Sequence, residues 1–294
     1  MKLRPVLRLT HEERMQLARP AIIALWIFGI TTFLVLTGLS HPLDKFLMFD
    51  LRHKISWLDH FLLVTESPGQ RKYVYPIAII LSLISTYRRK DLLPAIATLA
   101  ALVFTNAVTG VVKMATLRGF PRSAGPEVFN TSHTDLVNLG AYPSGHAANV
   151  AAFSTLMVLV AVSARPEYRK YAPHVLAITA LASGITFVSS WLRDTHWVTD
   201  LIAGLSLGVA STIFAVLWAL HLPNHWRHPE LAGRPRLVII TVGMSSLAGI
   251  FMFAANSFLS HSWTSLALLL GTVATIAWQS HKGVQRAIER KRSN

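Results

Sequence analysis

Three polar clusters between residues 113 and 200 contain side chains that could perform chemistry. In the third cluster His196 lies four residues before Asp200. Residues at this spacing share one face of a helix, so the carboxylate would accept a hydrogen bond from one imidazole nitrogen. The other nitrogen would then be free to attack an electrophile. The simpler alternative is a capping histidine beside an aspartate that faces the helix dipole, because a lone His-x3-Asp pattern is a weak indicator of catalysis.

The second cluster, residues 142–146, has the features of an anion site at a helix N-terminus. Pro143 suits the first turn of a helix, and the N–H groups of Ser144, Gly145 and His146 would then face an anion. Gly145 lacks a side chain, which lets a phosphate approach the backbone closely. His146 would lie beside that phosphate as a proton donor. A loop-to-helix junction with a turn glycine is the simpler explanation.

Four cations accompany these residues. Lys113 ends a long apolar segment, where snorkelling toward the membrane surface is the simpler role. Arg118 and Arg122 follow in a polar loop and could be solvated charges. Arg193 lies three residues before His196, so the two would share a face on a continuous helix, unless Arg193 pairs with a carboxylate at the surface. Two histidines, a carboxylate and several cations together form a set suited to breaking a phosphate ester.

The composition is that of a membrane protein. Hydrophobic residues make up 52% of the 294-residue chain and charged residues only 14%, against about 25% charged residues in soluble domains. About 20 apolar residues cross the hydrocarbon core of a bilayer, and six largely uncharged segments approach that length. The mixed segment 41–72 is expected to lie at the membrane interface. The expected spans are 20–40, 73–87, 92–112, 143–164, 171–190 and 200–220.

The C-terminal part adds two further spans. Residues 237–281 carry no formal charge over 45 positions, which is too long for one span and suits two. We therefore predict an all-α polytopic membrane helix bundle with eight transmembrane helices, a six-helix core at 20–220 and a hairpin at 237–281. Basic cytoplasmic segments are expected at 1–19, 221–236 and 282–294. A cleaved signal peptide would need a shorter apolar core, so we interpret the first span as an uncleaved anchor.

The distribution of positive charge indicates the orientation. With the N-terminus inside, 19 of the 28 Lys and Arg residues fall in inner segments. The positive-inside rule then places both termini in the cytoplasm and all three clusters on the outer side of the cell membrane. The net charge of +14 is explained by loops that face anionic lipid, and no nucleic-acid partner is expected. The absence of cysteine excludes thiol and disulfide chemistry.

Two weaker patterns have simpler explanations. His221, His225 and His228 are spaced like metal ligands, but they fall on the predicted cytoplasmic side, away from the clusters. We therefore expect no metal ion and no cofactor. Gly204 and Gly208 form a Gly-x3-Gly pattern, which predicts close helix packing.

In this order and topology the clusters resemble the motifs of the type-2 phosphatidic acid phosphatase superfamily, which includes membrane lipid phosphatases and vanadium haloperoxidases. The motifs of that superfamily are Lys-x6-Arg-Pro, Pro-Ser-Gly-His and Ser-Arg-x5-His-x3-Asp. The resemblance covers residues 40–220. The second motif matches fully at 143–146, and the third matches at Ser189, His196 and Asp200.

The resemblance implies a role for each matched residue. His196 would form a covalent phosphohistidine, Asp200 would orient it, and His146 would protonate the leaving oxygen. No metal is implied. The phosphoryl oxygens would be held by Lys113, Ser144 and the backbone of Gly145.

Two positions depart from the motifs. Phe120 stands at the arginine position of the first motif and Ser190 at that of the third. Loss of one preorganised donor to a transition-state charge can cost about 10²–10³ in rate. We expect nearby arginines to contact the phosphoryl group instead, namely Arg118, Arg122 and Arg193.

The sequence thus predicts a membrane lipid phosphate phosphatase that acts without metal on a lipid mono- or diphosphate at the outer membrane face. Isoprenoid diphosphate, phosphatidic acid and phosphatidylglycerophosphate are the candidate substrates, and membrane lipids are the expected surroundings. A lipid phosphotransferase is the close alternative. A non-catalytic transporter or scaffold is the other, although a transporter would carry ionisable residues near helix midpoints, which the predicted spans lack. The oligomeric state stays open.

Overall fold

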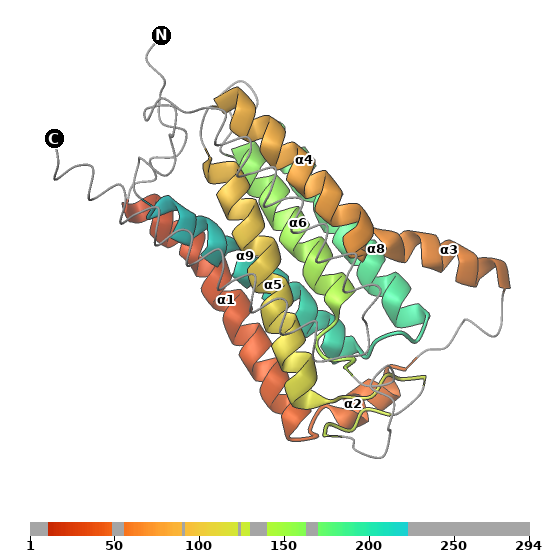
Figure 1. Ribbon diagram of the computed structural model, residues 1–294. Helices are drawn as coiled ribbons and strands as arrows, with labels where there is room; N and C mark the ends of the chain where they lie inside the picture. The colour runs from red at the N-terminus through yellow and green to blue at the C-terminus, as the bar shows by residue number, and fades with distance from the viewer. Residues whose placement is uncertain are drawn as a thin grey trace, which may run out of the picture. The chain divides into compact units, whose positions relative to one another are not determined.

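The described part of the chain is all-helical. The computed structural model of the protein describes residues 11–48, 56–89, 92–122, 125–129, 140–162 and 170–222. These residues contain no β-strand, as predicted (Figure 1). In chain order the helices are α1 (His11–Leu36), α2 (His41–Phe46), α3 (Ser56–Glu66), the 3₁₀ helix η1 (Ser67–Gly69), α4 (Arg71–Arg89), α5 (Leu93–Thr116), α6 (Gly145–Val162), α8 (Ala172–Leu192) and α9 (Val198–Leu220).

Each of the six expected core spans is a helix, namely α1, α4, α5, α6, α8 and α9. Four segments within these helices are long and apolar enough to cross a membrane: Met15–Leu36, Leu93–Thr116, Ala172–Leu192 and Val198–Leu220. Large apolar side chains such as Trp26 on α1 and Ile178 on α8 are exposed, as expected for surfaces that face lipid. The predicted hairpin 237–281, and with it the count of eight spans, lies outside the described residues.

Helix α9 lies at the centre of the bundle, where it packs against α1, α5 and α6 (Figure 1). Two glycines allow its close approach to α6. A Cβ atom on Gly204 would lie 2.9 Å from the Cβ of Ala147, and one on Gly208 would lie 2.8 Å from the Cβ of Ala151. Real side chains do not tolerate such distances, so the Gly-x3-Gly pattern serves close helix packing, as the sequence predicted.

Between α1 and α4 the described residues form the short helices α2 and α3 and the 3₁₀ helix η1. Neither reaches the length of about 20 residues that a span requires, which agrees with a segment that does not cross the membrane. Two of its acidic residues, Asp44 and Glu66, are nevertheless buried. Nothing in the sequence indicated a role for either residue, and both lie at the candidate site.

Three helix ends differ from the prediction. Helix α6 begins at Gly145, so Pro143 precedes the helix and is not in its first turn. Helix α5 continues to Thr116, which places Lys113 in its last turn. Between α8 and α9 the chain leaves the helical conformation, with Asp194 at a φ of 57°, a region that aspartate adopts more readily than most residues.

This last difference corrects the prediction that His196 and Asp200 share a face of one helix. His196 lies before α9, whose N-cap is Trp197. Asp200 is the third residue of α9, and its Oδ2 accepts a hydrogen bond of 3.1 Å from the Trp197 N–H. Such a contact satisfies one of the free N–H groups of a helix start. The turn therefore ends with the aspartate fixed close to the histidine.

Candidate active site

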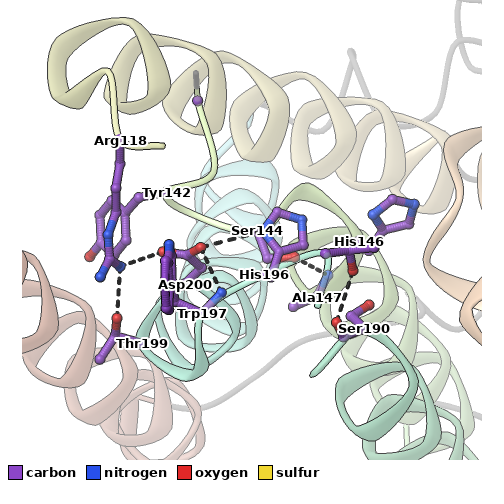
Figure 2. Close-up of polar contacts among 12 residues, drawn as sticks. Arg118, Tyr142, Ser144, His146, Ala147, Ser190, His196, Trp197, Thr199 and Asp200 are labelled. Carbon is purple, nitrogen blue, oxygen red and sulfur yellow. Dashed lines mark hydrogen bonds and ion pairs between the residues drawn. The ribbon is translucent and has the colours of Figure 1, made fainter. Parts of the chain in front are cut away.

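The candidate site lies where the C-terminal end of α5 meets the N-terminal ends of α6 and α9 (Figure 2). The imidazole rings of His146 and His196 come together there, with centroids 6.3 Å apart and planes at 65°. Ser144 is buried and donates its backbone N–H to the backbone oxygen of Asp200 at 2.9 Å. This bond joins the start of α6 to the start of α9, so the two predicted motifs hold each other in place.

Asp200 faces His196, as the spacing predicted. Nδ1 of His196 lies 3.5 Å from Oδ2 of Asp200, and both side chains are buried. That distance is too long for a well-formed hydrogen bond, and Nδ1 has no other partner within the described part of the chain. Catalytic hydrogen bonds are often long before substrate binds. The arrangement points Nδ1 at the carboxylate and leaves Nε2 as the nitrogen that could react.

Arg118 holds Asp200 from the other side (Figure 2). Its side chain has no exposed surface and forms ion pairs with Oδ1 of Asp200 at 2.5 Å and Oδ2 of Asp44 at 2.6 Å. Its Nε donates to the carbonyl oxygen of Pro126 at 3.1 Å. Burial alone would lower the pKa of Arg118, but the two carboxylates raise it above the ordinary value, so the guanidinium stays charged.

The predicted role of Arg118 therefore needs correction. A guanidinium enclosed by two carboxylates cannot also grip a phosphoryl group that arrives from outside the fold. Arg118 instead fixes the carboxylate of Asp200. Thr199 adds to this network, because its hydroxyl donates to Oδ2 of Asp44 at 2.8 Å and its backbone N–H donates to Oδ1 at 3.2 Å.

Arg193 is also held by carboxylates. Its Nε lies 3.1 Å from Oδ1 of Asp59, and its Nη1 pairs with Oε2 of Glu66. These two carboxylates, with the hydrogen bonds they accept, raise the pKa of Arg193 against the opposing effect of burial. The prediction that Arg193 contacts the phosphoryl group does not fit this geometry, because α8 ends at Leu192 and the side chain is turned toward α3.

Glu66 is a second carboxylate of the site, placed beside the other histidine. Its Oε1 lies 3.9 Å from Nδ1 of His146 and accepts hydrogen bonds from the hydroxyls of Ser190 at 2.8 Å and Thr195 at 3.2 Å. Burial would raise the pKa of Glu66, but His146, the Ser190 hydroxyl and Arg193 together lower it below its usual value. Each histidine thus has an ionised carboxylate behind it.

Phe120 lies near both Lys113 and His196. The Lys113 ammonium donates to the carbonyl oxygen of Gly140 and lies 6.0 Å from the centre of the Phe120 ring. That ring is 5.6 Å from the imidazole of His196. The aromatic ring at the motif arginine position therefore packs against the candidate nucleophile. Arg122 is exposed in a turn, and its predicted contact with phosphate stays a prediction.

Sequence reasoning missed the acidic residues of α2 and α3. Asp44 lies 74 residues from Arg118, and Glu66 lies 127 residues from Arg193. No local spacing signals pairs this distant. The one sign in the sequence that these carboxylates lie inside the fold was their position in a segment also rich in aromatic and aliphatic side chains.

No metal cluster is found in the described ranges, where no group of three or more His, Asp, Glu or Cys side chains converges. Of the three histidines considered as ligands, His225 and His228 lie outside those ranges.

Comparison with known proteins agrees with the resemblance noted from the motifs. The PAP2 superfamily matches residues 94–223. Among solved structures the chain is similar to a transmembrane PAP2-type phosphatidylglycerophosphate phosphatase from Bacillus subtilis, with a TM-score of 0.52 and 20% identity over 68% of this chain and 94% of that one. At this identity the similarity shows a shared fold. No curated protein matches the chain.

Proposed function

We propose, from the match of residues 94–223 to the PAP2 superfamily, that the protein is a lipid phosphate phosphatase that works through a phosphohistidine at His196. With its apolar helices and the fold of a transmembrane phosphatase, the chain is a multi-pass membrane protein. One observation carries the proposal: two imidazoles lie 6.3 Å apart, and each has a carboxylate behind it.

The geometry suggests how the work is divided between the histidines. Nε2 of His196 would attack phosphorus and form a P–N bond while the P–O bond to the lipid breaks. Asp200 would stabilise the positive charge that develops on the attacking ring. His146, whose Nδ1 lies 3.9 Å from Oε1 of Glu66, would give a proton to the departing oxygen.

A second step would regenerate the enzyme. Neutral His146 would take a proton from water as that water attacks phosphorus, the P–N bond would break, and inorganic phosphate would leave. In both steps the backbone N–H groups at the start of α6 and the ammonium of Lys113 would stabilise the phosphoryl oxygens.

The substrate class follows from the surroundings of the site. The histidines lie at helix ends in a bundle whose outer surface carries exposed apolar side chains, so a ligand with its phosphate at the headgroup level of a bilayer fits best. We propose a lipid mono- or diphosphate of the phosphatidylglycerophosphate, phosphatidic acid or isoprenoid diphosphate type, reached from the outer face of the cell membrane. Both chain termini would then be cytoplasmic.

Phosphate release by the purified protein tests the proposal. The three lipid phosphates would be supplied in detergent micelles with a chelator present, and the proposal expects release from at least one of them. His196→Ala should abolish release, whereas His174→Ala should not, because His174 is an exposed histidine of α8. Equal release by the His196 variant contradicts the proposed nucleophile. Transfer of phosphate to an added lipid alcohol, without release, would identify a phosphotransferase.

A further inference from the structure

The site as described is short of positive charge. A phosphoryl group needs cations that stay close to its oxygens. The PAP2 motifs have an arginine at two positions where this chain has Phe120 and Ser190. Arg118 and Arg193 are each paired with two carboxylates. From the predicted set, Lys113 supplies a nearby charge, whereas Arg122 is exposed in a turn.

Another guanidinium lies at this end of the bundle, on a helix that carries none of the motifs. Arg71 is the first residue of α4. Its Nη2 lies 3.9 Å from the point that a Cβ atom of Gly145 would occupy. Lys113 lies in the last turn of α5, near the Phe120 ring that packs beside His196, so two cationic side chains lie at this end of the bundle.

Arg71 differs from Arg118 and Arg193 in its partners. No carboxylate among the described residues forms an ion pair with it, and its side chain is only partly exposed. A guanidinium in the first turn of a helix also faces the positive end of the helix dipole, which is unfavourable, and no acidic residue in that turn compensates. Helix stability therefore gives no reason for an arginine at this position.

Residues on both sides of Arg71 pack this part of the chain against α6. Two residues earlier, Gly69 packs so tightly that a Cβ atom there would lie 2.7 Å from the backbone oxygen of His146. Four residues later, the hydroxyl of Tyr75 donates to Oδ1 of Asn149 at 3.0 Å. Nδ2 of Asn149 in turn donates to the backbone oxygen of Gly69 at 3.4 Å. These contacts join η1 and α4 to the first turns of α6, with Arg71 between them.

We propose that Arg71 binds the phosphoryl oxygens of the substrate, in place of the guanidinium that the motif positions lack. A planar guanidinium can hold two oxygens at once, and the α6 backbone N–H groups next to Gly145 complete the anion site. The inference rests on the proposed function, since it assigns a residue to the phosphoryl group of that reaction.

Binding of inorganic phosphate tests this role without turnover. Isothermal titration of the full chain in detergent would compare wild type with Arg71→Ala, Arg71→Lys and Arg19→Ala. Arg71→Ala should weaken phosphate binding about tenfold or more, because a charge-assisted hydrogen bond is lost. Arg71→Lys should recover part of the affinity, since lysine keeps the charge but loses the fork. Arg19 is an exposed arginine near the start of α1, and its variant should bind like wild type.

A parallel assay of lipid phosphate hydrolysis separates the two proposals. If wild type hydrolyses lipid phosphate and Arg71→Ala binds phosphate as tightly as wild type, the role of Arg71 is overturned and the proposed function stands. If phosphate binding weakens in the Arg71→Ala variant while wild type hydrolyses none of the lipids, the phosphate-binding role of Arg71 is supported and the hydrolase proposal fails. If Arg71→Ala does not fold, Arg71→Lys decides, because unchanged phosphate affinity in that variant overturns the bidentate contact.

Discussion

Replacing Arg118 by methionine should destabilise the fold and release the carboxylate that orients His196. Methionine keeps much of the volume of the arginine stem but leaves Asp44 and Asp200 without their common cation. Both carboxylates have no exposed surface, and each lies within 2.6 Å of the guanidinium.

The size of the effect follows from this burial. Removal of one partner from a buried ion pair costs about 3–5 kcal/mol. Two carboxylates are affected here, but one of them can take up a proton, and raising a carboxyl pKa by about three units to reach neutrality costs about 4 kcal/mol. We therefore expect a loss of about 4–6 kcal/mol, and at about 2–4 °C for each kcal/mol a fall in melting temperature of about 10–20 °C.

Thermal unfolding in detergent, followed by circular dichroism, would measure this loss. Arg122→Met is the matched control, because Arg122 is exposed and its loss should change stability by less than about 0.5 kcal/mol. Combining Arg118→Met with Asp44→Asn should restore part of the stability, since one buried charge is then absent. An Arg118→Met protein that melts within about 2 °C of wild type would refute the reasoning.

Three further predictions concern packing, pH and orientation. Gly208→Ala should cost about 1–3 kcal/mol by overpacking the contact with α6, whereas Gly184→Ala, with open space around its Cβ position, should not lower the melting temperature. The folded-state pKa of Glu66 lies below its ordinary value of 4.5, so its ionised form stabilises the fold above that pH and this contribution is lost as the pH falls. Glu66→Gln should then lose less melting temperature than wild type between about pH 5 and pH 3, and an equal loss would contradict the pKa argument. A cysteine at Ser132 should react with an impermeant thiol reagent from outside intact cells and one at Ser293 should not, and the reverse pattern would place the site in the cytoplasm.

Much of the fold was predictable from the sequence because each core span is marked by a local run of apolar residues. A run of about 20 apolar residues predicts a membrane helix whatever lies elsewhere in the chain. The pairing of His196 with Asp200 was also predictable, although the turn at Asp194 means that capping of α9, and not a shared helix face, brings the two together.

The fate of the arginines was not predictable in this way. Whether a guanidinium binds a phosphate or a carboxylate depends on which acidic residues the fold places beside it. Asp44 and Glu66 come from short helices that are far from the motifs in sequence. Asp44 forms an ion pair with Arg118, and Glu66 forms one with Arg193. Arg71 had no motif to mark it, and only the packing of α4 on α6 places it beside Gly145.

The most direct test of the central claim is capture of the covalent intermediate. Wild-type protein would be mixed with a radiolabelled lipid phosphate that it hydrolyses, quenched in alkaline denaturant, and digested for mass spectrometry. The phosphohistidine mechanism predicts an acid-labile, alkali-stable phosphoryl group on His196, retained in His174→Ala and absent from His196→Ala. A phosphoryl group on another residue, or a phosphoprotein that survives in His196→Ala, would contradict the mechanism.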